Sequence, residues 1–154
     1  IQELIKQGET TNIEFKSTLR VNLHTSSLDS RMEHSVLKTI AAFLNSDGGT
    51  LLIGADDSGN VIGIEDDNFQ NEDKMNLHLV NLLRNRLGSE NMLYIKPKFE
   101  SVNGRRVLRI DCDKARSAVY LKDGSNEQFF IRTGAATAEL LPSQIQEYVK
   151  HRFN

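Results

Sequence analysis

The stretch from Ile40 to Asp57 constrains the fold of this chain more than any other part of it. Apolar residues recur at helical spacing at Met32, Val36, Ile40 and Leu44, which predicts a helix over about 31–45. The pair Gly48-Gly49 ends this helix, and the apolar run over 50–53 is too short to form another. Because glycines lie on both sides of that run, it predicts a fully buried strand. The sequence therefore predicts the helix, tight turn and strand of an ordinary α/β core.

Polar residues stand at both ends of this unit. Ser30 and Glu33 have the form of a capping box at the start of the helix. Asp56 and Asp57 follow the strand, and the helix, turn and strand before them could hold these two carboxylates rigidly in a metal-binding site. Aspartates in such a place form turns more often than they bind ligands. From the pattern alone we therefore expect a turn here, with metal binding as the alternative.

The rest of the chain mixes helices with strands connected mainly by hairpins, which predicts an α+β fold. We expect a single domain over 1–154, with a mixed or mostly antiparallel sheet and flanking helices, and we expect it to be part of a longer protein because it starts at Ile1. The other expected helices cover 1–7, then 72–87 with Leu77, Val80, Leu83 and Leu87 buried, and a last helix from Pro142 with Ile145, Tyr148 and Val149 buried. The other expected strands cover 12–16, 61–64 in a hairpin after the turn at 56–60, 119–121 and 128–132, with a loop over 18–29 and a turn at 122–124.

One further hairpin has a register that the sequence predicts. Asn103-Gly104 is a strong signal for a two-residue turn. Such a turn places Lys98 opposite Arg109, and facing like charges cost about a few tenths of a kcal/mol when exposed. A bound anion such as phosphate would offset that cost. The other expected pairs are Val102 with Arg105, Phe99 with Leu108, Pro97 with Ile110 and Lys96 with Asp111.

The composition excludes several classes of protein. The formal net charge of -2 gives no overall attraction to nucleic acid, so any such binding needs a local basic patch. Cys112 is the only cysteine, which excludes an internal disulfide and favours a reducing, cytoplasmic location. Four scattered histidines with one cysteine predict no zinc site. No apolar run is long enough to cross a membrane, so we expect a soluble domain without membrane insertion.

The strand over 12–16 carries the clearest candidate chemistry. Glu14 and Lys16 alternate with Phe15, so the carboxylate and the ammonium lie on one face of the strand. Metal-dependent nucleases commonly use such a pair, the carboxylate to hold Mg²⁺ or Mn²⁺ and the lysine to stabilise developing negative charge. A solvated ion pair on a strand face is the more common reading of this motif alone. Glu9, five positions earlier, can join the site only from the turn after Gly8.

A second cationic segment precedes the last helix. Arg132, Thr133 and Gly134, followed by Thr137, could bind phosphate or could simply end a strand before a glycine turn. There is no P-loop motif and no nucleophile elbow, and Cys112 has no partner that marks it as a nucleophile.

These segments together resemble the AlbA-2 domain of the Schlafen family. The resemblance covers nearly the whole chain and rests on the ordered set of motifs, because each alone is weak. The motifs are Gly8-Glu9, Ile13-Glu14-Phe15-Lys16, Ala42-Phe43-Leu44-Asn45, the run from Gly48 to Asp57, Val61-Ile62-Gly63-Ile64, and Phe129-Phe130-Ile131-Arg132-Thr133-Gly134.

The resemblance implies an α+β nucleic-acid-binding domain. Schlafen cores that cleave tRNA and rRNA use three acids and a divalent cation, and by motif these acids are Glu9, Glu14 and Asp57, with Asp56 as a neighbouring candidate. Animal Schlafen cores contain two such domains in tandem, which together surround RNA. A comparable RNA-binding surface would need a homodimer of this chain. Their cysteine and histidine zinc set is missing here. Many bacterial relatives are regarded as DNA-binding or regulatory modules, sometimes as divergent ATPases.

We therefore expect a nucleic-acid-binding domain with metal-dependent endoribonuclease activity on structured RNA such as tRNA. Glu9, Glu14 and Asp57 would hold Mg²⁺ or Mn²⁺, and Lys16 would steady the phosphate or the attacking water. The alternative is a non-catalytic DNA- or RNA-binding module of a larger protein. The residues expected to follow the nucleic-acid backbone are Lys96, Lys98, Arg109 and Arg132.

Overall fold

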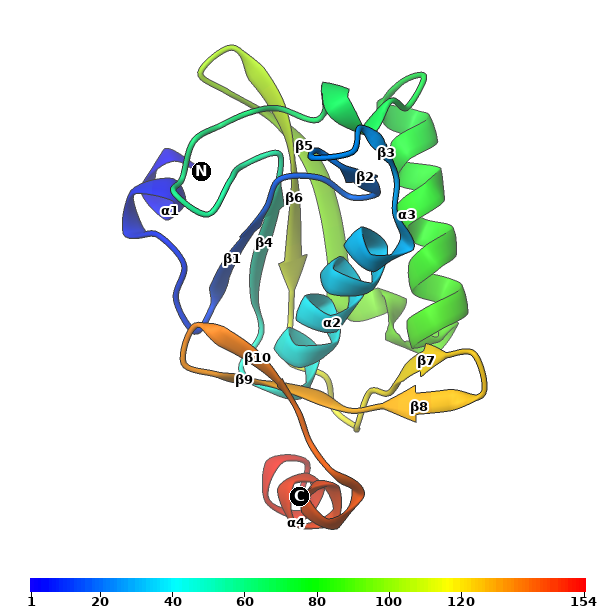
Figure 1. Cartoon of the computed structure of the whole chain (residues 1–154). Helices are drawn as coiled ribbons and strands as arrows, with labels where there is room; N and C mark the ends of the chain where they lie inside the picture. The colour runs from blue at the N-terminus through cyan, green and yellow to red at the C-terminus, as the bar shows by residue number, and fades with distance from the viewer.

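The computed structural model describes all 154 residues, and a four-stranded sheet lies at its centre (Figure 1). The strand order is β1-β4-β6-β5, with β1 parallel to β4 and the other neighbours antiparallel. The expected α+β fold with a mixed sheet is therefore confirmed. The strands are β1 (Ile13–Lys16), β4 (Gly49–Ile53), β5 (Ile95–Val102) and β6 (Arg105–Cys112).

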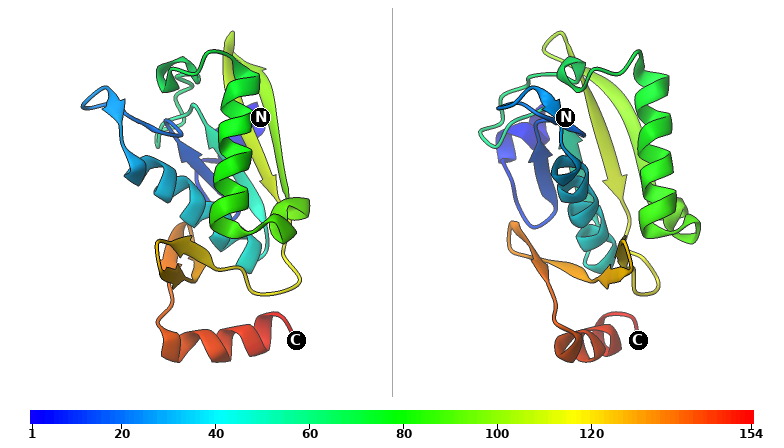
Figure 2. Two further views of the ribbon diagram at one scale, coloured as in Figure 1. Left: turned by 90° about the vertical axis from the view of Figure 1, so that its right-hand side faces the viewer. Right: turned by 45° about the vertical axis from the view of Figure 1, so that its right-hand side comes forward.

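Two long helices and one short helix cover the sheet (Figures 1 and 2). The main apolar core joins α2 (Ser30–Asn45) and α3 (Glu72–Leu87) to the face that carries Leu51 and Ile53 of β4. A smaller cluster on the opposite face joins Phe15 and Leu52 to α1 (Gln2–Gln7). Because side chains alternate along a strand, Glu14 and Lys16 lie on the α2 side of the sheet, level with Leu51 and Ile53.

The register of the β5–β6 hairpin agrees with the prediction at every expected pair, including Lys98 opposite Arg109 and Lys96 opposite Asp111. Asn103 and Gly104 have φ values of 54° and 77°, so both central residues of the turn are left-handed. This is the geometry of a type I′ turn, whose twist matches that of the flanking strands.

The expected strand over 61–64 is wrong. Only one bridge, between Ala55 and Val61, joins this segment to the end of β4. Gly54 then turns the chain instead: its φ is 106°, and its carbonyl accepts the N–H groups of both Ile62 and Gly63. A Cβ on Gly54 would lie 3.1 Å from the carbonyl carbon of Gly63, so the close crossing of the two segments favours glycine at this position.

Two helix details also differ from expectation. The N-cap of α2 is Asp29, which accepts the Arg31 N–H, so Ser30 and Glu33 do not form the predicted capping box. Glu33 contacts His78 of α3 instead. In α3 the buried side chains are Met75, Leu79, Leu83 and Leu87, whereas Leu77 is 54% exposed. The prediction is therefore right for Leu83 and Leu87 and wrong for Leu77, while Val80 is only partly buried, because apolar residues lie on two sides of this helix.

The segments outside the main sheet form small hairpins and short 3₁₀ helices. The predicted loop over 18–29 contains the first hairpin, and the predicted strand over 128–132 is divided between two others. The β7–β8 turn consists of Gly124 and Ser125 and not of the predicted residues 122–124. These elements are β2 (Val21–Asn22), β3 (Ser27–Leu28), η1 (Glu65–Asp67), η2 (Ser89–Tyr94), β7 (Leu121–Asp123), β8 (Asn126–Gln128), β9 (Phe130–Thr133) and β10 (Ala136–Glu139).

The last helix, α4 (Pro142–Arg152), begins at its predicted proline and lies apart from the main body in both views of Figure 2. Hydrogen bonds connect α4 to the C-terminal end of α2. The Tyr148 hydroxyl donates to the Asn45 carbonyl at 2.6 Å, and the Arg152 guanidinium donates to the carbonyls of Leu44 and Ser46. Its expected inner residues, which include Tyr148, are only partly buried, and no residue of the helix is fully buried.

Asn45 provides a test of this architecture. Its buried amide donates to the carbonyls of Val119 and Phe130 and accepts the Val119 N–H, at 2.9 to 3.0 Å. Asn45→Ala leaves these buried groups without partners and should lower the free energy of unfolding by about 2–4 kcal/mol. Urea denaturation measures the loss, with the exposed Asn85→Ala of α3 as a matched control that should change it by less than about 0.5 kcal/mol. Equal stability of the two variants would contradict the assigned role.

Candidate acidic site and nucleic-acid interface

The structure brings two of the expected acids into contact. Glu9 lies in the loop after α1 and accepts the backbone N–H of Phe15 at 3.1 Å. Its carboxyl group also hydrogen-bonds to that of Glu14, which comes from β1. Asp57 lies in the turn after β4, close enough for its charge to act on Glu9. Three acids from three segments therefore face one region of the molecule.

The proximity of these acids changes the protonation of Glu9. Burial above all, together with the hydrogen bond and the negative charge of Glu14, raises the pKa of this carboxyl to about 7. The Phe15 N–H acts in the opposite direction, and the charge of Asp57 adds to the increase. Near neutral pH, Glu9 therefore exchanges a proton that a bound cation could replace.

Arg132 does not lie where the sequence suggested. Its side chain is fully buried, so it is not available to a nucleic-acid backbone, and this expectation is corrected. The guanidinium donates to Glu14 Oε1 at 2.8 Å, to the carbonyls of Thr10 and Thr11, and to the Thr137 hydroxyl. Arg132 is thus a structural cation that holds Glu14 and the loop carrying Glu9.

The two neighbouring aspartates have different surroundings. Asp56 accepts the N–H groups of Ser58 and Asn60 and the Asn60 side-chain amide, and these bonds lower its pKa. It is the turn former that the sequence predicted. Asp57 is exposed and has no hydrogen-bond partner, so its carboxylate is free to bind a ligand.

Lys16 lies two residues beyond Glu14 on the same face of β1 and is partly buried. The predicted pairing of a carboxylate and an ammonium on one strand face is therefore present in the structure. No ion pair holds the Lys16 ammonium, so it remains free for another partner.

The donor atoms of this acidic site are carboxylate oxygens, which suit a hard cation such as Mg²⁺ or Mn²⁺. No group of three or more histidine, cysteine, aspartate or glutamate side chains is arranged to hold a metal ion. Mg²⁺ usually takes only one or two carboxylates and completes its shell with water and substrate phosphates. The carboxylates of Glu9, Glu14 and Asp57 fit this chemistry as oxygen donors, and one or two of them would suffice for such a cation, but the three do not form a closed cage.

The other expected cations lie on the sheet face opposite α2 and α3. Lys96 and Lys98 are exposed, and Arg109 is partly exposed. Each has an acidic partner: Asp113 at 2.8 Å, Glu100 at 3.7 Å and Asp111 at 3.0 Å, respectively. The facing charges of Lys98 and Arg109 are therefore neutralised within the protein, and no bound anion is needed to explain their register.

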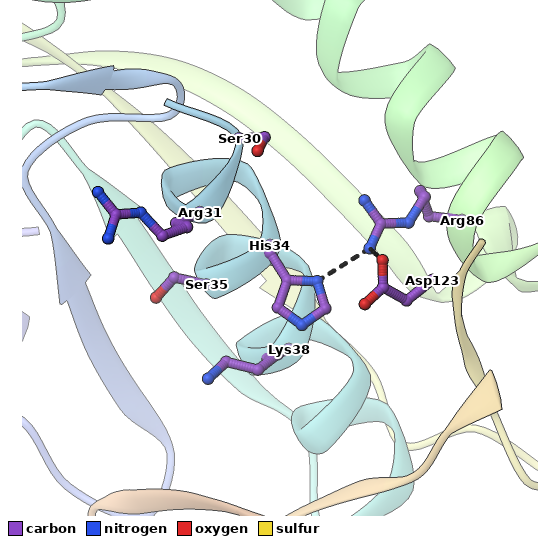
Figure 3. Close-up of a pocket in the computed structure, with 7 residues that line it drawn as sticks. All are labelled: Ser30, Arg31, His34, Ser35, Lys38, Arg86 and Asp123. Carbon is purple, nitrogen blue, oxygen red and sulfur yellow. Dashed lines mark hydrogen bonds and ion pairs between the residues drawn. The ribbon is translucent and has the colours of Figure 1, made fainter. Parts of the chain in front are cut away.

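Sequence reasoning missed a second group of basic residues (Figure 3). A hollow of about 420 Å³ beside α2 is lined by no hydrophobic residue, and we refer to it as the cationic hollow. Arg31, His34 and Lys38 recur at helical spacing, which was a visible signal, but Arg86 joins them only through the tertiary packing of α3. The cationic hollow is formed by Ser30, Arg31, His34, Ser35 and Lys38 of α2, Arg86 of α3 and Asp123 of β7.

Comparison with known proteins identifies the family. The sequence model of the family described as Schlafen, AlbA_2 matches residues 9–141, which is most of the chain and includes all three acids. The chain belongs to the Schlafen AlbA_2 family. This membership confirms the family expected from the motifs and makes the chain a nucleic-acid-related domain.

Two solved structures share this AlbA_2 fold. The DIP2311 protein from Corynebacterium diphtheriae superposes with a TM-score of 0.66 at 19% identity, over 94% of this chain and 28% of that one. The N-terminal domain of a RecG-related protein from Nitrosomonas europaea superposes with a TM-score of 0.57 at 24% identity, over 84% of this chain and 85% of that domain. The AlbA_2 chain thus spans little more than a quarter of the Corynebacterium protein. No helix in the structure is long and apolar enough to cross a membrane.

The structural role of Arg132 can be tested by a double-mutant cycle. Arg132→Ala leaves the Glu14 carboxylate unpaired in a largely buried place and should lower the free energy of unfolding by about 3–5 kcal/mol. Adding Glu14→Gln removes the unpaired charge, so the double variant should lose less than the sum of the single losses. Urea denaturation measures all four proteins, and Arg116→Ala, at an exposed arginine, is the matched control. An Arg132→Ala variant as stable as this control would contradict the buried role.

The raised pKa of Glu9 predicts a pH dependence of stability. Its folded-state pKa of about 7 lies above the ordinary glutamate pKa of 4.5, so folding favours the protonated form. That stabilisation is complete below the unfolded pKa and is lost as pH rises through about 7. In EDTA, the urea midpoint of the wild type should fall between pH 5 and pH 8 relative to that of Glu9→Gln. The exposed Glu127→Gln serves as the control, and parallel profiles for wild type and Glu9→Gln would contradict the shift.

Proposed function

We propose that this domain binds nucleic acid and cleaves structured RNA such as tRNA with the help of a divalent cation. The observation that carries the proposal is the contact between Glu9 and Glu14 beside Asp57, although the three acids come from separate segments. Grouping like charges raises the free energy of the folded chain, and such groups concentrate at functional sites. The same three positions are the ones that the resemblance to RNA-cleaving Schlafen cores implies.

The residues would divide the work as follows. Glu9, Glu14 and Asp57 would hold Mg²⁺ or Mn²⁺, which when bound supplies a Lewis acid for the phosphate and lowers the pKa of water. Lys16 would donate to a phosphate oxygen beside Glu14 and stabilise negative charge there. Arg132 would act as a positioning residue, because its buried bonds fix Glu14 and the Thr10–Thr11 backbone.

The sheet cations Lys96, Lys98 and Arg109 could still contact a nucleic-acid backbone, but only by exchanging their acidic partners for phosphates. Exposed ion pairs contribute about 0–1 kcal/mol, so such an exchange costs little. A cradle like that of the tandem Schlafen cores would require two copies of this chain. A homodimer on RNA is therefore part of the proposal, and sedimentation velocity with and without RNA would detect it.

The second candidate function is a non-catalytic DNA- or RNA-binding module. The observation that favours it is the Arg132–Glu14 ion pair, which already neutralises one of the three acids, together with the absence of a preformed metal cage. In such a module the acids would have a structural role only. Nucleic-acid binding would then persist without any cleavage.

The test uses end-labelled tRNA, duplex DNA and single-stranded DNA incubated with the domain in Mn²⁺, Mg²⁺ or EDTA. We expect cleavage of tRNA that requires the cation. Asp57→Asn is the sharpest variant because Asp57 is exposed and holds no other residue. It should reduce cleavage by about 100-fold or more, since metal-assisted charge stabilisation is worth several kcal/mol.

The matched control is Glu127→Gln, which removes an exposed acid on β8 and should cleave like the wild type. Gel shifts in EDTA should show equal RNA binding by all three proteins. Substrates that shift but stay intact would support the binding module and overturn the nuclease assignment. Failure of every nucleic acid to bind would overturn both candidate functions.

A further inference from the structure

The cationic hollow lies on the outer side of α2, away from the sheet (Figure 3). Arg86 organises it from the last turn of α3. Its Nε donates to the Lys122 carbonyl, and its Nη2 donates to His34 Nδ1 at 2.9 Å. The carboxylate of Asp123 is 3.9 Å from the same Nη2. Three elements that are distant in sequence are thus joined around this hollow.

The contact with Arg86 determines the state of His34. Because Nδ1 accepts from Arg86, the ring proton of the neutral imidazole must be on Nε2. Burial lowers the pKa of His34, and the charges of Arg86 and Lys38 lower it further. His34 is therefore a neutral donor near neutral pH, and its Nε2–H has no partner within the protein.

Other donors around the hollow are also free. Asp29 holds the Nε and Nη2 of Arg31, but Nη1 has no partner. Lys38 has no carboxylate partner, and its Nζ is 5.9 Å from the centre of the Phe130 ring. Asp123 is the only acid in the lining, and its distance from Arg86 makes it a weak partner. The hollow thus presents several donors with too few acceptors.

This imbalance identifies the chemistry of the missing partner. Donors from Lys38, His34, Arg31 and Ser35 suit an anion that has several acceptor oxygens, as a phosphate group has. No hydrophobic residue lines the hollow that would hold an apolar peptide side chain. A contact with a backbone phosphate carries no base-sequence information by itself.

We propose that the cationic hollow binds a backbone phosphate of the nucleic acid that this domain recognises. The proposal rests on the nucleic-acid-binding part of the proposed function and does not require cleavage. It assigns a backbone contact to Lys38 and to the Nε2–H of His34, which have no acidic partner, whereas the cations of the β5–β6 face are paired with acids.

The test measures the affinity for a fluorescein-labelled single-stranded RNA by anisotropy at several salt concentrations in EDTA. Lys38→Gln removes one phosphate contact, so it should weaken binding and reduce the slope of log affinity against log salt by about 0.7. Asp123→Asn removes the only acid of the hollow and should strengthen binding. The opposite directions matter, because a merely structural role for this region would not raise affinity. Lys150→Gln, at an exposed lysine of α4, is the matched control and should bind like the wild type.

The outcomes separate this proposal from the proposed function. If the wild type binds RNA and both hollow variants bind like the control, the hollow is not the phosphate site and this proposal alone is overturned. Weaker binding by Asp123→Asn, at unchanged stability, would overturn it as well. If the wild type binds neither RNA nor DNA, the proposed function fails and this proposal fails with it. Weaker binding by Lys38→Gln with tighter binding by Asp123→Asn supports it.

Discussion

The acidic site of this Schlafen AlbA_2 domain depends on one buried cation, Arg132. Its guanidinium, which the protein fully covers, joins β9 to the loop after α1 and to Glu14 of β1. An arginine buried without such partners would destabilise the chain by several kcal/mol, so folding must bring Glu14 and the Thr10–Thr11 carbonyls to it. The same loop carries Glu9. The bonds that satisfy Arg132 therefore also hold the two glutamates in contact.

The features that the sequence predicted well are those that neighbouring residues determine. Asn103-Gly104 selects one turn geometry, and a two-residue turn then determines every pair of the β5–β6 hairpin. The helix before Gly48 and the short apolar run after it follow from local periodicity in the same way. Asp56 acts as a turn former because its side chain bonds to the backbone only two and four residues ahead.

The features that the sequence did not predict depend on contacts between distant segments. Arg132 and Glu14 are 118 residues apart, and nothing local distinguishes a buried arginine at a strand end from an exposed one. The face of α3 could not be chosen because Leu77 and Leu79 offer apolar surface on different sides, and only packing against α2 and the sheet decides between them. Arg86 likewise reaches His34 across 52 residues, so the cationic hollow exists only in the folded chain.

The charges of the two regions indicate different tasks. With all three acids ionised, Glu9, Glu14 and Asp57 carry three negative charges, and Arg132 and Lys16 offset only two of them, so this region repels a phosphate unless a proton or a cation neutralises it. The cationic hollow has the opposite balance and can attract a phosphate without help. Nucleic-acid binding and any cleavage can therefore take place at different sites of opposite charge. Donors on α2 can bind the nucleic-acid backbone directly, whereas the acids can approach it only after their negative charge is neutralised. The raised pKa of Glu9 has the same cause. The proton that Glu9 retains near neutral pH partly relieves the repulsion among the three acids, and a divalent cation would relieve that repulsion more fully.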